Sequence, residues 1–364
     1  MKYIDEFRNR RLIERLSLRI KQITPQGQIN IMEVCGTHTQ GFFRFGLGEF
    51  LPSNIRLISG PGCPVCVSPQ EYINKAVWLS RKKEVIIATF GDMLRVPGDS
   101  STLEKERARQ GNISVVYSPL DALTIAERNP KKRVVFLAVG FETTAAAIAA
   151  SVIAARKRNI ANLFFLTSLR LIPPAMEYLL NDKRLRLSGF LCPGHVSAII
   201  GTKPYAFIPK RYKIGCCVAG FEPLDIMEGV YFLLRQIIAH RPCVQNQYSR
   251  VVSKEGNPIA KRFIRQAFEV IDSAWRGLGV IAQSGLGLKK AYSRFDAQRE
   301  FSIPSFGVSG KHFSRCRCGD VLKGLSSPLM CPLFNKACVP DNPRGPCMVS
   351  HEGACNVYYR YHRK

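Results

Sequence analysis

Short apolar runs alternate with amphipathic stretches along most of the chain, and this alternation predicts an α/β fold. The amphipathic stretches predict helices over residues 69–81, in segments that end near residues 156 and 238, and in a segment that begins at Pro173-Pro174. Strands that alternate with helices form parallel sheets with right-handed crossovers. The apolar runs predict strands at residues 28–34, 55–59, 85–90, 113–117, 134–139, 163–167, 188–191 and 214–218.

The phrase Gly-Phe-Glu occurs at residues 140–142 and again at 220–222, each time where a predicted strand gives way to a helix. This repetition favours two α/β units in series. We therefore expect two Rossmann-like parallel-sheet lobes that face a cleft, over residues 28–110 and 111–240. Ligands of such sheets bind beyond the carboxyl ends of the strands, so we search for chemistry there.

Both ends of the chain depart from this pattern. Residues 1–27 are expected to form an amphipathic helix that packs on the body. Residues 241–364 are expected to form a C-terminal domain, with a helix around 259–271 and a glycine-rich, strand-like stretch over 277–287. The first expectation rests on apolar residues at roughly helical spacing: Ile4, Phe7, Leu12, Ile13, Leu16 and Ile20.

The 364 residues carry a formal net charge of +26. The cationic residues come in small scattered groups, without a basic tail or a recognition motif, which favours a solvated surface over a nucleic-acid binder. The most apolar stretch, residues 145–155, is too short to cross a bilayer. Charges of both signs near the start argue against a targeting segment, so we expect a cytoplasmic protein without a membrane partner.

Thirteen cysteines are more than a cytosolic protein uses for structural disulfides, which indicates metal or redox chemistry. Cys35 ends the first predicted strand, in the phrase Cys35-Gly36-Thr37-His38, and a thiolate there can hold iron, copper or zinc. Cys63 and Cys66 form a Cys-x-x-Cys after the second strand. That spacing suits a reversible disulfide, or half of a zinc site.

Four polar residues directly follow predicted strands: His38, Asp92, Glu142 and His195. Each alone can be a helix cap or a satisfied buried group. Because the carboxyl ends of strands converge, we expect at least two of them to line one site. Four other cysteines are interpreted as structural: Cys192, Cys216, Cys217 and Cys243.

The last 50 residues hold six cysteines: Cys316, Cys318, Cys331, Cys338, Cys347 and Cys355. Six thiols exceed one four-ligand site by two, so the count predicts four metal ligands and a redox pair. All-thiolate sites suit zinc or an iron–sulfur cluster, and the count alone leaves both open. The segment has little apolar mass, and a bound metal would stabilise its fold.

Five ordered motifs that span nearly the whole chain resemble the HypD family of hydrogenase maturation factors. They are Cys35-Gly36-Thr37-His38, Gly62-Cys63-Pro64-Val65-Cys66, Gly140-Phe141-Glu142-Thr143-Thr144, Pro193-Gly194-His195-Val196-Ser197 and Gly345-Pro346-Cys347-Met348-Val349-Ser350. The resemblance implies a scaffold on which the Fe(CN)2CO unit of [NiFe] hydrogenase is assembled. It implies the chaperone HypC and the cyanide donor HypE as partners, and the hydrogenase large subunit as an indirect one.

The resemblance also implies roles for single residues. Cys35 would bind Fe(II), carrying CN and CO, together with a cysteine of HypC. Cys63 and Cys66 would form a redox pair at that iron and join its metal site, with His38 beside it. Glu142 and His195 would act at the same site.

The tail is similar in layout to the cluster domain of ferredoxin–thioredoxin reductase. By that likeness Cys316, Cys331, Cys338 and Cys355 would hold a [4Fe-4S] cluster, and Cys318 and Cys347 would form the neighbouring redox pair. The protein would then be an assembly scaffold with redox chemistry rather than a conventional turnover enzyme. The high positive charge departs from what we expect of such a factor, and it leaves attraction to acidic partner proteins possible.

Two rival functions remain at this point. The first is a [4Fe-4S]-dependent thiol–disulfide reductase that acts on protein substrates, which would need neither iron nor cyanide at Cys35. The second is a zinc-stabilised nucleic-acid binder, which would show salt-dependent affinity for DNA or RNA.

Overall fold

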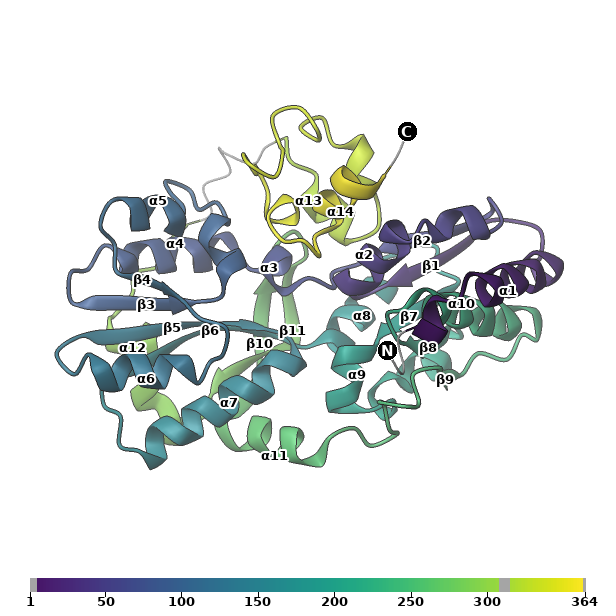
Figure 1. Ribbon diagram of the computed structural model, residues 1–364. Helices are drawn as coiled ribbons and strands as arrows, with labels where there is room; N and C mark the ends of the chain where they lie inside the picture. The colour runs from purple at the N-terminus through teal and green to yellow at the C-terminus, as the bar shows by residue number, and fades with distance from the viewer. Residues whose placement is uncertain (1–4, 308–314, 363–364) are drawn as a thin grey trace.

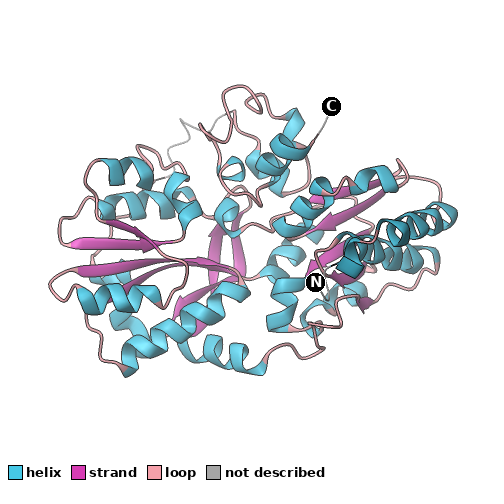
Figure 2. Cartoon of the chain, in the orientation of Figure 1, coloured by secondary structure: helices cyan, strands magenta, loops and turns pink. Residues whose placement is uncertain are grey.

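The computed structural model describes residues 5–307 and 315–362. These residues form the expected α/β fold, with two sheets in which parallel pairing dominates. Figure 1 shows the two sheets side by side, with the cysteine-rich tail (yellow) above the region where they meet. Helices flank the strands throughout, and the tail contains mostly loops and short helices (Figure 2).

The first sheet has five parallel strands in the order β2-β1-β7-β8-β9. This is a doubly wound order, and its switch point lies between β1 and β7, where the connections leave in opposite directions. The strands are β1 (Ile29–Glu33), β2 (Ile55–Ser59), β7 (Gly189–Pro193), β8 (Gly215–Ala219) and β9 (Val244–Asn246).

The second sheet has six strands in the order β10-β11-β6-β5-β3-β4. The four strands from β6 to β4 are parallel, whereas β10 and β11 form an antiparallel hairpin at the edge of the sheet. The strands are β3 (Val85–Thr89), β4 (Ile113–Val115), β5 (Arg133–Gly140), β6 (Leu163–Arg170), β10 (Phe268–Trp275) and β11 (Gly279–Leu288).

The chain passes between the two sheets instead of completing one before the other. Strand β3, inside the range 28–110, pairs with β5, whereas β7 and β8, inside 111–240, belong with β1. The sheets therefore do not follow the two contiguous ranges expected from the sequence. The hydrophobic pattern identifies each strand but not its neighbour, because a parallel crossover is long enough to reach either sheet.

The helices that connect these strands vary from one turn to four. The α-helices are α1 (Arg10–Ile23), α2 (Gly36–Arg44), α3 (Pro64–Val67), α4 (Gln70–Ser80), α5 (Leu103–Ala108), α6 (Asp121–Arg128), α7 (Glu142–Lys157), α8 (Ile172–Leu180), α9 (Gly194–Ile200), α10 (Pro223–Ile238), α11 (Pro258–Ala267), α12 (Ala297–Glu300), α13 (Cys318–Leu322) and α14 (Ala354–Tyr361). The shorter turns are η1 (Asp5–Arg8), η2 (Leu47–Phe50), η3 (Gly91–Arg95), η4 (Lys203–Tyr205), η5 (Ile208–Tyr212), η6 (Lys290–Phe295), η7 (Pro328–Met330) and η8 (Pro346–Met348).

Strand alternation explains the core of the first sheet, since successive side chains of a strand point to opposite faces. Cys217 of β8 packs in the cluster formed with α1 and α10, whereas Cys216 packs in the large cluster on the opposite face. Cys192, Cys216 and Cys217 are fully buried, as a structural role requires, but Cys243 is exposed. The expected N-terminal helix is α1, which packs on α10 through Ile13, Leu16 and Ile20; Ile4 lies outside the described residues.

The expected helix over residues 259–271 ends early. Helix α11 stops at Ala267, and Phe268 begins β10 at once. The glycine-rich stretch is indeed a strand, β11, and it pairs along almost its whole length with β10. Pairing with β11, a strand further along the chain, therefore overrides the helical pattern of residues 268–271.

Candidate functional site

Cys35 lies where β1 ends and α2 begins, at the switch point of the first sheet. Its side chain is almost buried, and burial together with the nearby Glu352 raises the pKa of the thiol to about 12. Gly36 fits closely beneath the tail, because a Cβ there would lie 2.4 Å from the carbonyl oxygen of Glu352. The Thr37 hydroxyl donates a hydrogen bond of 2.7 Å to the Glu352 carboxylate. The C-terminal tail is therefore part of the Cys35 site.

The Cys-x-x-Cys segment packs directly on the Cys35 loop. β1 and β2 are neighbours, as expected. The Gly36 amide donates to the Gly62 carbonyl at 3.2 Å, and a Cβ on Gly62 would lie 2.2 Å from the Cys35 nitrogen. Helix α3 begins at Pro64, and Cys63 and Cys66 are joined in a buried disulfide. The glycines of this motif thus permit the close approach of the two cysteine loops.

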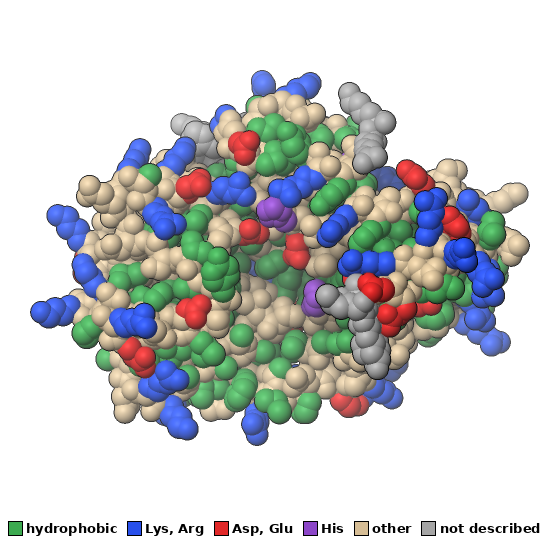
Figure 3. Space-filling model, in the orientation of Figure 1, with side chains coloured by type: hydrophobic (Ala, Val, Ile, Leu, Met, Phe, Trp, Pro, Cys, Tyr) green, Lys and Arg blue, Asp and Glu red, His purple; other side chains and the backbone are tan. Residues whose placement is uncertain are grey.

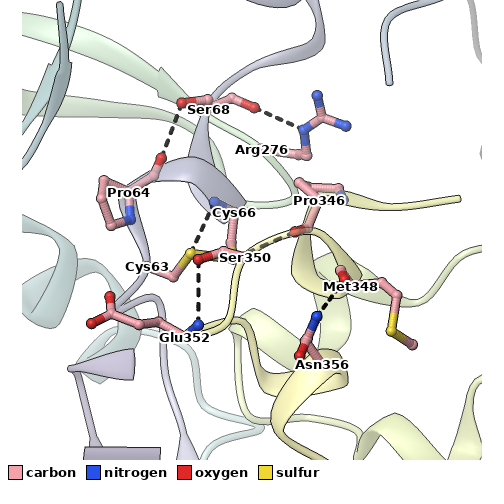
Figure 4. The surroundings of a disulfide bond; sticks show 10 residues. All are labelled: Cys63, Pro64, Cys66, Ser68, Arg276, Pro346, Met348, Ser350, Glu352 and Asn356. Atoms are coloured by element: carbon pink, nitrogen blue, oxygen red, sulfur yellow. Dashed lines mark hydrogen bonds between the residues drawn. A yellow bond between two sulfur atoms is a disulfide. The ribbon is translucent and has the colours of Figure 1, made fainter. Parts of the chain in front are cut away.

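The disulfide also faces the tail, as Figure 4 shows. The Cys66 sulfur lies 3.8 Å from the carbonyl oxygen of Pro346, the residue that precedes Cys347. The Glu352 amide donates to the Ser350 hydroxyl at 3.3 Å, which shapes the turn between the disulfide and Cys35. The tail thus contacts both cysteine elements of the first sheet, through Pro346 of its motif at Cys66 and through Glu352 beyond the motif at the Cys35 loop.

A pocket of about 380 Å³ opens beside Cys35. It lies among the amino-terminal turns of α2, α7 and α9, so residues from both sheets contribute to its wall. Polar groups in the wall include Cys35, Thr37, Thr143, Thr144, His195 and Glu352. The first turns of α2 and α7 contribute residues to this wall, and the amino-terminal end of a helix favours negative charge nearby.

Of the four polar residues expected near the strand ends, only His195 lines this pocket. Its ring stacks on Phe221 with centroids 3.9 Å apart, and burial lowers the pKa of the imidazole. The ring of His38 also packs on Phe221, with centroids 4.8 Å apart. The second Gly-Phe-Glu phrase thus places an aromatic ring in contact with two imidazoles.

His38 is fully buried behind the pocket wall. Its Nε2 lies 2.9 Å from the carbonyl oxygen of Gly220, to which it can donate, and burial lowers its pKa to about 4. The buried Nδ1 has no hydrogen-bond partner among the described residues. The His38 amide donates to the Cys35 carbonyl at 3.0 Å, and its ring packs on Phe221, which stacks on His195 of the pocket wall. Its geometry is therefore that of a positioning residue.

Glu142 and Asp92 do not line the pocket either. Glu142 accepts a 3.0 Å hydrogen bond from the Ile172 amide, and burial raises the pKa of its carboxyl group to about 7. It therefore connects the start of α7 to the start of α8. Asp92 lies in η3, on the second sheet. In the motif Gly140–Thr144, the polar groups that line the pocket come from Thr143 and Thr144, which follow Glu142.

Sequence reasoning missed Glu352. It lies two residues beyond the tail motif that ends at Ser350, and nothing in its own surroundings in the sequence indicates a site. The available signal was Gly36, whose missing side chain leaves room for the Glu352 backbone. A glycine beside a candidate ligand implies close approach by another segment, but the sequence does not say which segment.

The tail thiols gather in part. The Cys316 and Cys318 sulfurs are 3.2 Å apart, and Cys347 is in hydrogen-bond contact with Cys318 and Cys355. Donation by Cys318 and Cys347 lowers the pKa of Cys355 to about 6. Cys338 accepts the Arg344 amide at 3.3 Å, while Cys331 is half-buried in the same loop. Within residues 5–307 and 315–362, no group of three or more potential ligands has the geometry of a metal site.

Basic side chains on the face drawn in Figure 3 are spread widely and do not form one continuous patch. This distribution agrees with the solvated surface expected from the scattered cationic groups. No helix in the described part of the chain is long and apolar enough to cross a membrane.

Fold and site together define a thiol-rich α/β protein in which two cysteine loops and a cysteine-rich tail meet beside one pocket. A family model named HypD, described as "Hydrogenase formation hypA family", matches residues 11–362. The hydrogenase maturation factor HypD2 of Bradyrhizobium diazoefficiens is 43% identical over 372 residues, which cover 100% of this chain and 97% of that protein. The hydrogenase maturation factor HypD of Escherichia coli K12 is 43% identical over 371 residues, with 100% and 99% covered.

The hydrogenase maturation factor HypD of Azotobacter vinelandii is 42% identical over 372 residues, which cover 100% of this chain and 98% of that protein. The chain therefore belongs to the HypD family of hydrogenase maturation factors, which confirms the resemblance noted in its motifs. A role in hydrogenase maturation follows from this membership.

Proposed function

We propose that this chain, together with HypC, is the scaffold on which the Fe(CN)2CO unit of [NiFe] hydrogenase is assembled, with cyanide delivered by HypE. The observation that carries the proposal is the direct packing of the Cys63–Cys66 loop on Cys35 at the pocket. The iron unit is cargo, and it passes on to the hydrogenase large subunit. Family membership supports the pathway, and the arrangement of thiols supports the site.

The pocket suits such a cargo chemically. Cys35 provides a soft sulfur ligand, which is compatible with Fe(II) that also carries cyanide and carbon monoxide. The hydroxyl groups of Thr143 and Thr144 and the ring of His195 provide donors for anionic ligands. The strand order supports the further proposal that the sheets are two Rossmann-like lobes and the pocket their cleft. Membership of the HypD family, which supports the pathway, also supports the proposal that the protein works in the cytoplasm.

The tail thiols have the donor chemistry of an iron–sulfur site. Cys316, Cys331, Cys338 and Cys355 would hold a [4Fe-4S] cluster, which supplies single electrons when bound. Cys318 and Cys347 form the remaining pair, and their contact supports this division.

A thiolate of the Cys318/Cys347 pair then attacks the Cys63–Cys66 bond and forms a mixed disulfide, which the second thiolate resolves. One S–S bond breaks and one forms, while two electrons and two protons pass to Cys63 and Cys66.

Infrared spectroscopy of the chain copurified with HypC tests the proposal. We expect absorption bands of iron-bound cyanide and carbon monoxide in the wild type and their loss in Cys35→Ala. Cys243→Ser is the matched control, because Cys243 is a free and exposed cysteine far along the chain from the pocket motifs. A wild-type complex without bound iron and cyanide would refute the scaffold role.

The contact between the disulfide and the tail also supports a second function, a [4Fe-4S]-dependent thiol–disulfide reductase. Such an enzyme would reduce protein disulfides without HypC and would retain this activity in Cys35→Ala. Turnover of a disulfide substrate by Cys35→Ala, together with an iron-free wild-type complex, would favour the reductase.

A further inference from the structure

Basic segments precede all four parallel strands of the second sheet. These strands stand in the order β6-β5-β3-β4, so the segments that enter them are neighbours in space although they lie far apart in the sequence. In Figure 1 this end of the sheet lies at the far left, away from the region where the two sheets meet. We call the four segments the basic row; they are residues 156–162, 127–133, 81–84 and 106–112.

The basic row concentrates the charge of the protein. Its 25 residues include twelve Lys or Arg and three Glu, so they carry nine of the 26 excess positive charges of the 364-residue chain. Adjacent strands lie about 4.8 Å apart, which is less than the Debye length of about 8 Å at physiological salt, so charges of neighbouring segments act together. The sheet therefore gathers groups that look scattered in the sequence, at an end of the molecule that Figure 3 shows only at its left edge.

The glutamates of the row neutralise little of this charge. Glu106 accepts hydrogen bonds from Nε and Nη2 of Arg81, both at 3.0 Å, and Glu127 lies 3.4 Å from Nη1 of Arg158. Each pair joins two neighbouring segments of the row. Within the described residues, no carboxylate pairs with three exposed cations of the row: Arg128, Lys131 and Lys157.

Hydrogen bonds to the backbone hold the segments in fixed positions. The side-chain amide of Asn162 donates to the carbonyls of Ala126, Asn129 and Lys132 at 2.9–3.0 Å. The Lys132 ammonium donates to the Lys83 carbonyl at 2.9 Å, which links the segments before β5 and β3. A molecule that binds here therefore meets a preorganised backbone, which lowers the entropy cost of binding.

The chemistry of the row favours a protein over a nucleic acid as the partner. The four segments contain no aromatic residue on which a base could stack. Two rings packed beneath them already have cations over them: Lys82 lies 4.2 Å from the Trp78 centroid, and Arg133 lies 4.5 Å from that of Phe301. A compact positive surface without stacking faces is complementary to clustered carboxylates of another protein.

We propose that the basic row is a docking surface for an acidic face of a partner protein. Strand β5 begins in the row at Arg133 and ends at Gly140, shortly before Thr143 of the pocket wall. Its eight residues place the row about 26 Å from that end of the strand. A partner on the row therefore leaves the pocket open. The inference uses neither thiols nor iron, so it goes beyond the proposed function.

The test is the affinity of the full chain for a fluorescent peptide of about ten glutamates, measured by polarisation. We expect the wild type to bind the peptide and to bind it more weakly at about 200 mM salt than at about 50 mM. The row variant Arg128→Glu/Lys131→Glu/Lys157→Glu should lose about tenfold or more in affinity, because three attractive charges become repulsive. Circular dichroism checks that it folds.

The matched control reverses the same number of charges outside the row. It is Lys183→Glu/Lys210→Glu/Lys254→Glu, in which all three lysines are exposed. Its affinity should stay within about threefold of wild type, since these charges lie beyond the row and are screened. An equal loss in both variants would mean that net charge alone attracts the peptide, which would overturn the proposal. Wild-type affinity in the row variant would overturn it too.

A DNA duplex of the same formal charge as the peptide is the second probe. Tighter binding of the duplex than of the peptide, lost in the row variant, would overturn the proposal in favour of a nucleic acid. If the row variant does not fold, Arg128→Gln/Lys131→Gln/Lys157→Gln decides, and a peptide affinity within about twofold of wild type overturns the proposal. Cys35→Ala should bind the peptide as the wild type does, so failure of the scaffold role would leave this result unchanged.

Discussion

Two buried glycines, Gly36 and Gly62, allow the cysteine loops and the tail to pack in contact. A single added methyl group at either position would prevent this packing. Gly36 lies against Glu352, and Gly62 lies against the backbone of Cys35. The atoms they face are mostly backbone atoms, which cannot rotate away. Any side chain at either position must therefore separate segments that the proposed chemistry needs together.

Gly62→Ala is accordingly expected to destabilise the fold by about 1–3 kcal/mol, the usual cost of overpacking. The new Cβ would overlap the Cys35 nitrogen at 2.2 Å. Gly91→Ala is the control, since its Cβ would meet nothing closer than 3.8 Å. Urea denaturation of both variants measures the difference. Equal unfolding free energies of the two variants would mean that the two cysteine loops can move apart without loss of stability.

Glu142 provides a pH-dependent test at the same scale. Burial raises its folded pKa from 4.5 to about 7, so the folded state keeps a proton that the unfolded state has lost. Stability from this group is thus present below pH 4.5 and is lost as the pH rises toward 7. At 1.36 kcal/mol per pKa unit, the loss is roughly 3 kcal/mol.

Glu142→Gln keeps the acceptor for the Ile172 amide but does not ionise. We expect its unfolding free energy to fall less than that of wild type between pH 5 and pH 8, measured by denaturation at both values. Parallel pH profiles of the two proteins would show that Glu142 is not protonated in the fold.

Phe221 is expected to control the environment of His195. Its ring covers the imidazole, and burial lowers the pKa of that group. In Phe221→Ala the ring of His195 should become more hydrated, and its pKa should rise toward the ordinary value of about 6.5. A titration followed by NMR measures this pKa. A value unchanged from wild type would mean that other residues bury His195.

Among the elements, helix α1 shows that the pattern of apolar residues predicts both the helix and the face that it buries. Its apolar stripe predicted a packed helix, and Ile20 is fully buried against α10 while Leu18 is 60% exposed. Ile20→Ala should cost about 2–5 kcal/mol, the range for truncation of buried aliphatic side chains. Leu18→Ala should cost less than about 0.5 kcal/mol, as surface changes do. Thermal unfolding of the pair tests this, and equal midpoints would contradict the packing.

The strands themselves were predictable, since each is a short apolar run bounded by polar or glycine-rich segments. Their pairing was not, because β1 joins β7 across more than 150 residues and no periodicity encodes such a partner. The end of α11 was missed for the same reason, since β11 decides that Phe268 is a strand residue. Cys35 and the Cys-x-x-Cys were found from residue type and position after strands. His38 and Glu142 have the right positions but are buried, which depends on what packs over them.

At the scale of the whole molecule, the tail contacts elements of both sheets, and the proposed function gives its six cysteines two roles. If the proposed [4Fe-4S] cluster is bound by these thiols, replacing Cys331 or Cys338 should remove it and increase protease sensitivity, because metal binding and folding are coupled in such sites. Cys318→Ser and Cys347→Ser should keep iron and sulfide but stop hydrogenase maturation, since a disulfide needs both thiols. Iron and sulfide analysis of all six single variants tests the division. Similar loss in all six would leave one metal site without a relay.

The passage of the chain between the two sheets has a consequence for synthesis on the ribosome. Cys35 emerges early, but β7, the second neighbour of β1, is complete only at Pro193, and Glu352 follows much later. At about 5–20 residues per second, the nascent Cys35 thiol waits on the order of 15–60 s before its pocket closes. A ribosome-bound chain that stops before β7 should therefore react with a thiol reagent at Cys35, whereas the released protein should be protected. Because the site closes late, the nascent chain itself does not protect Cys35 from binding metal during synthesis.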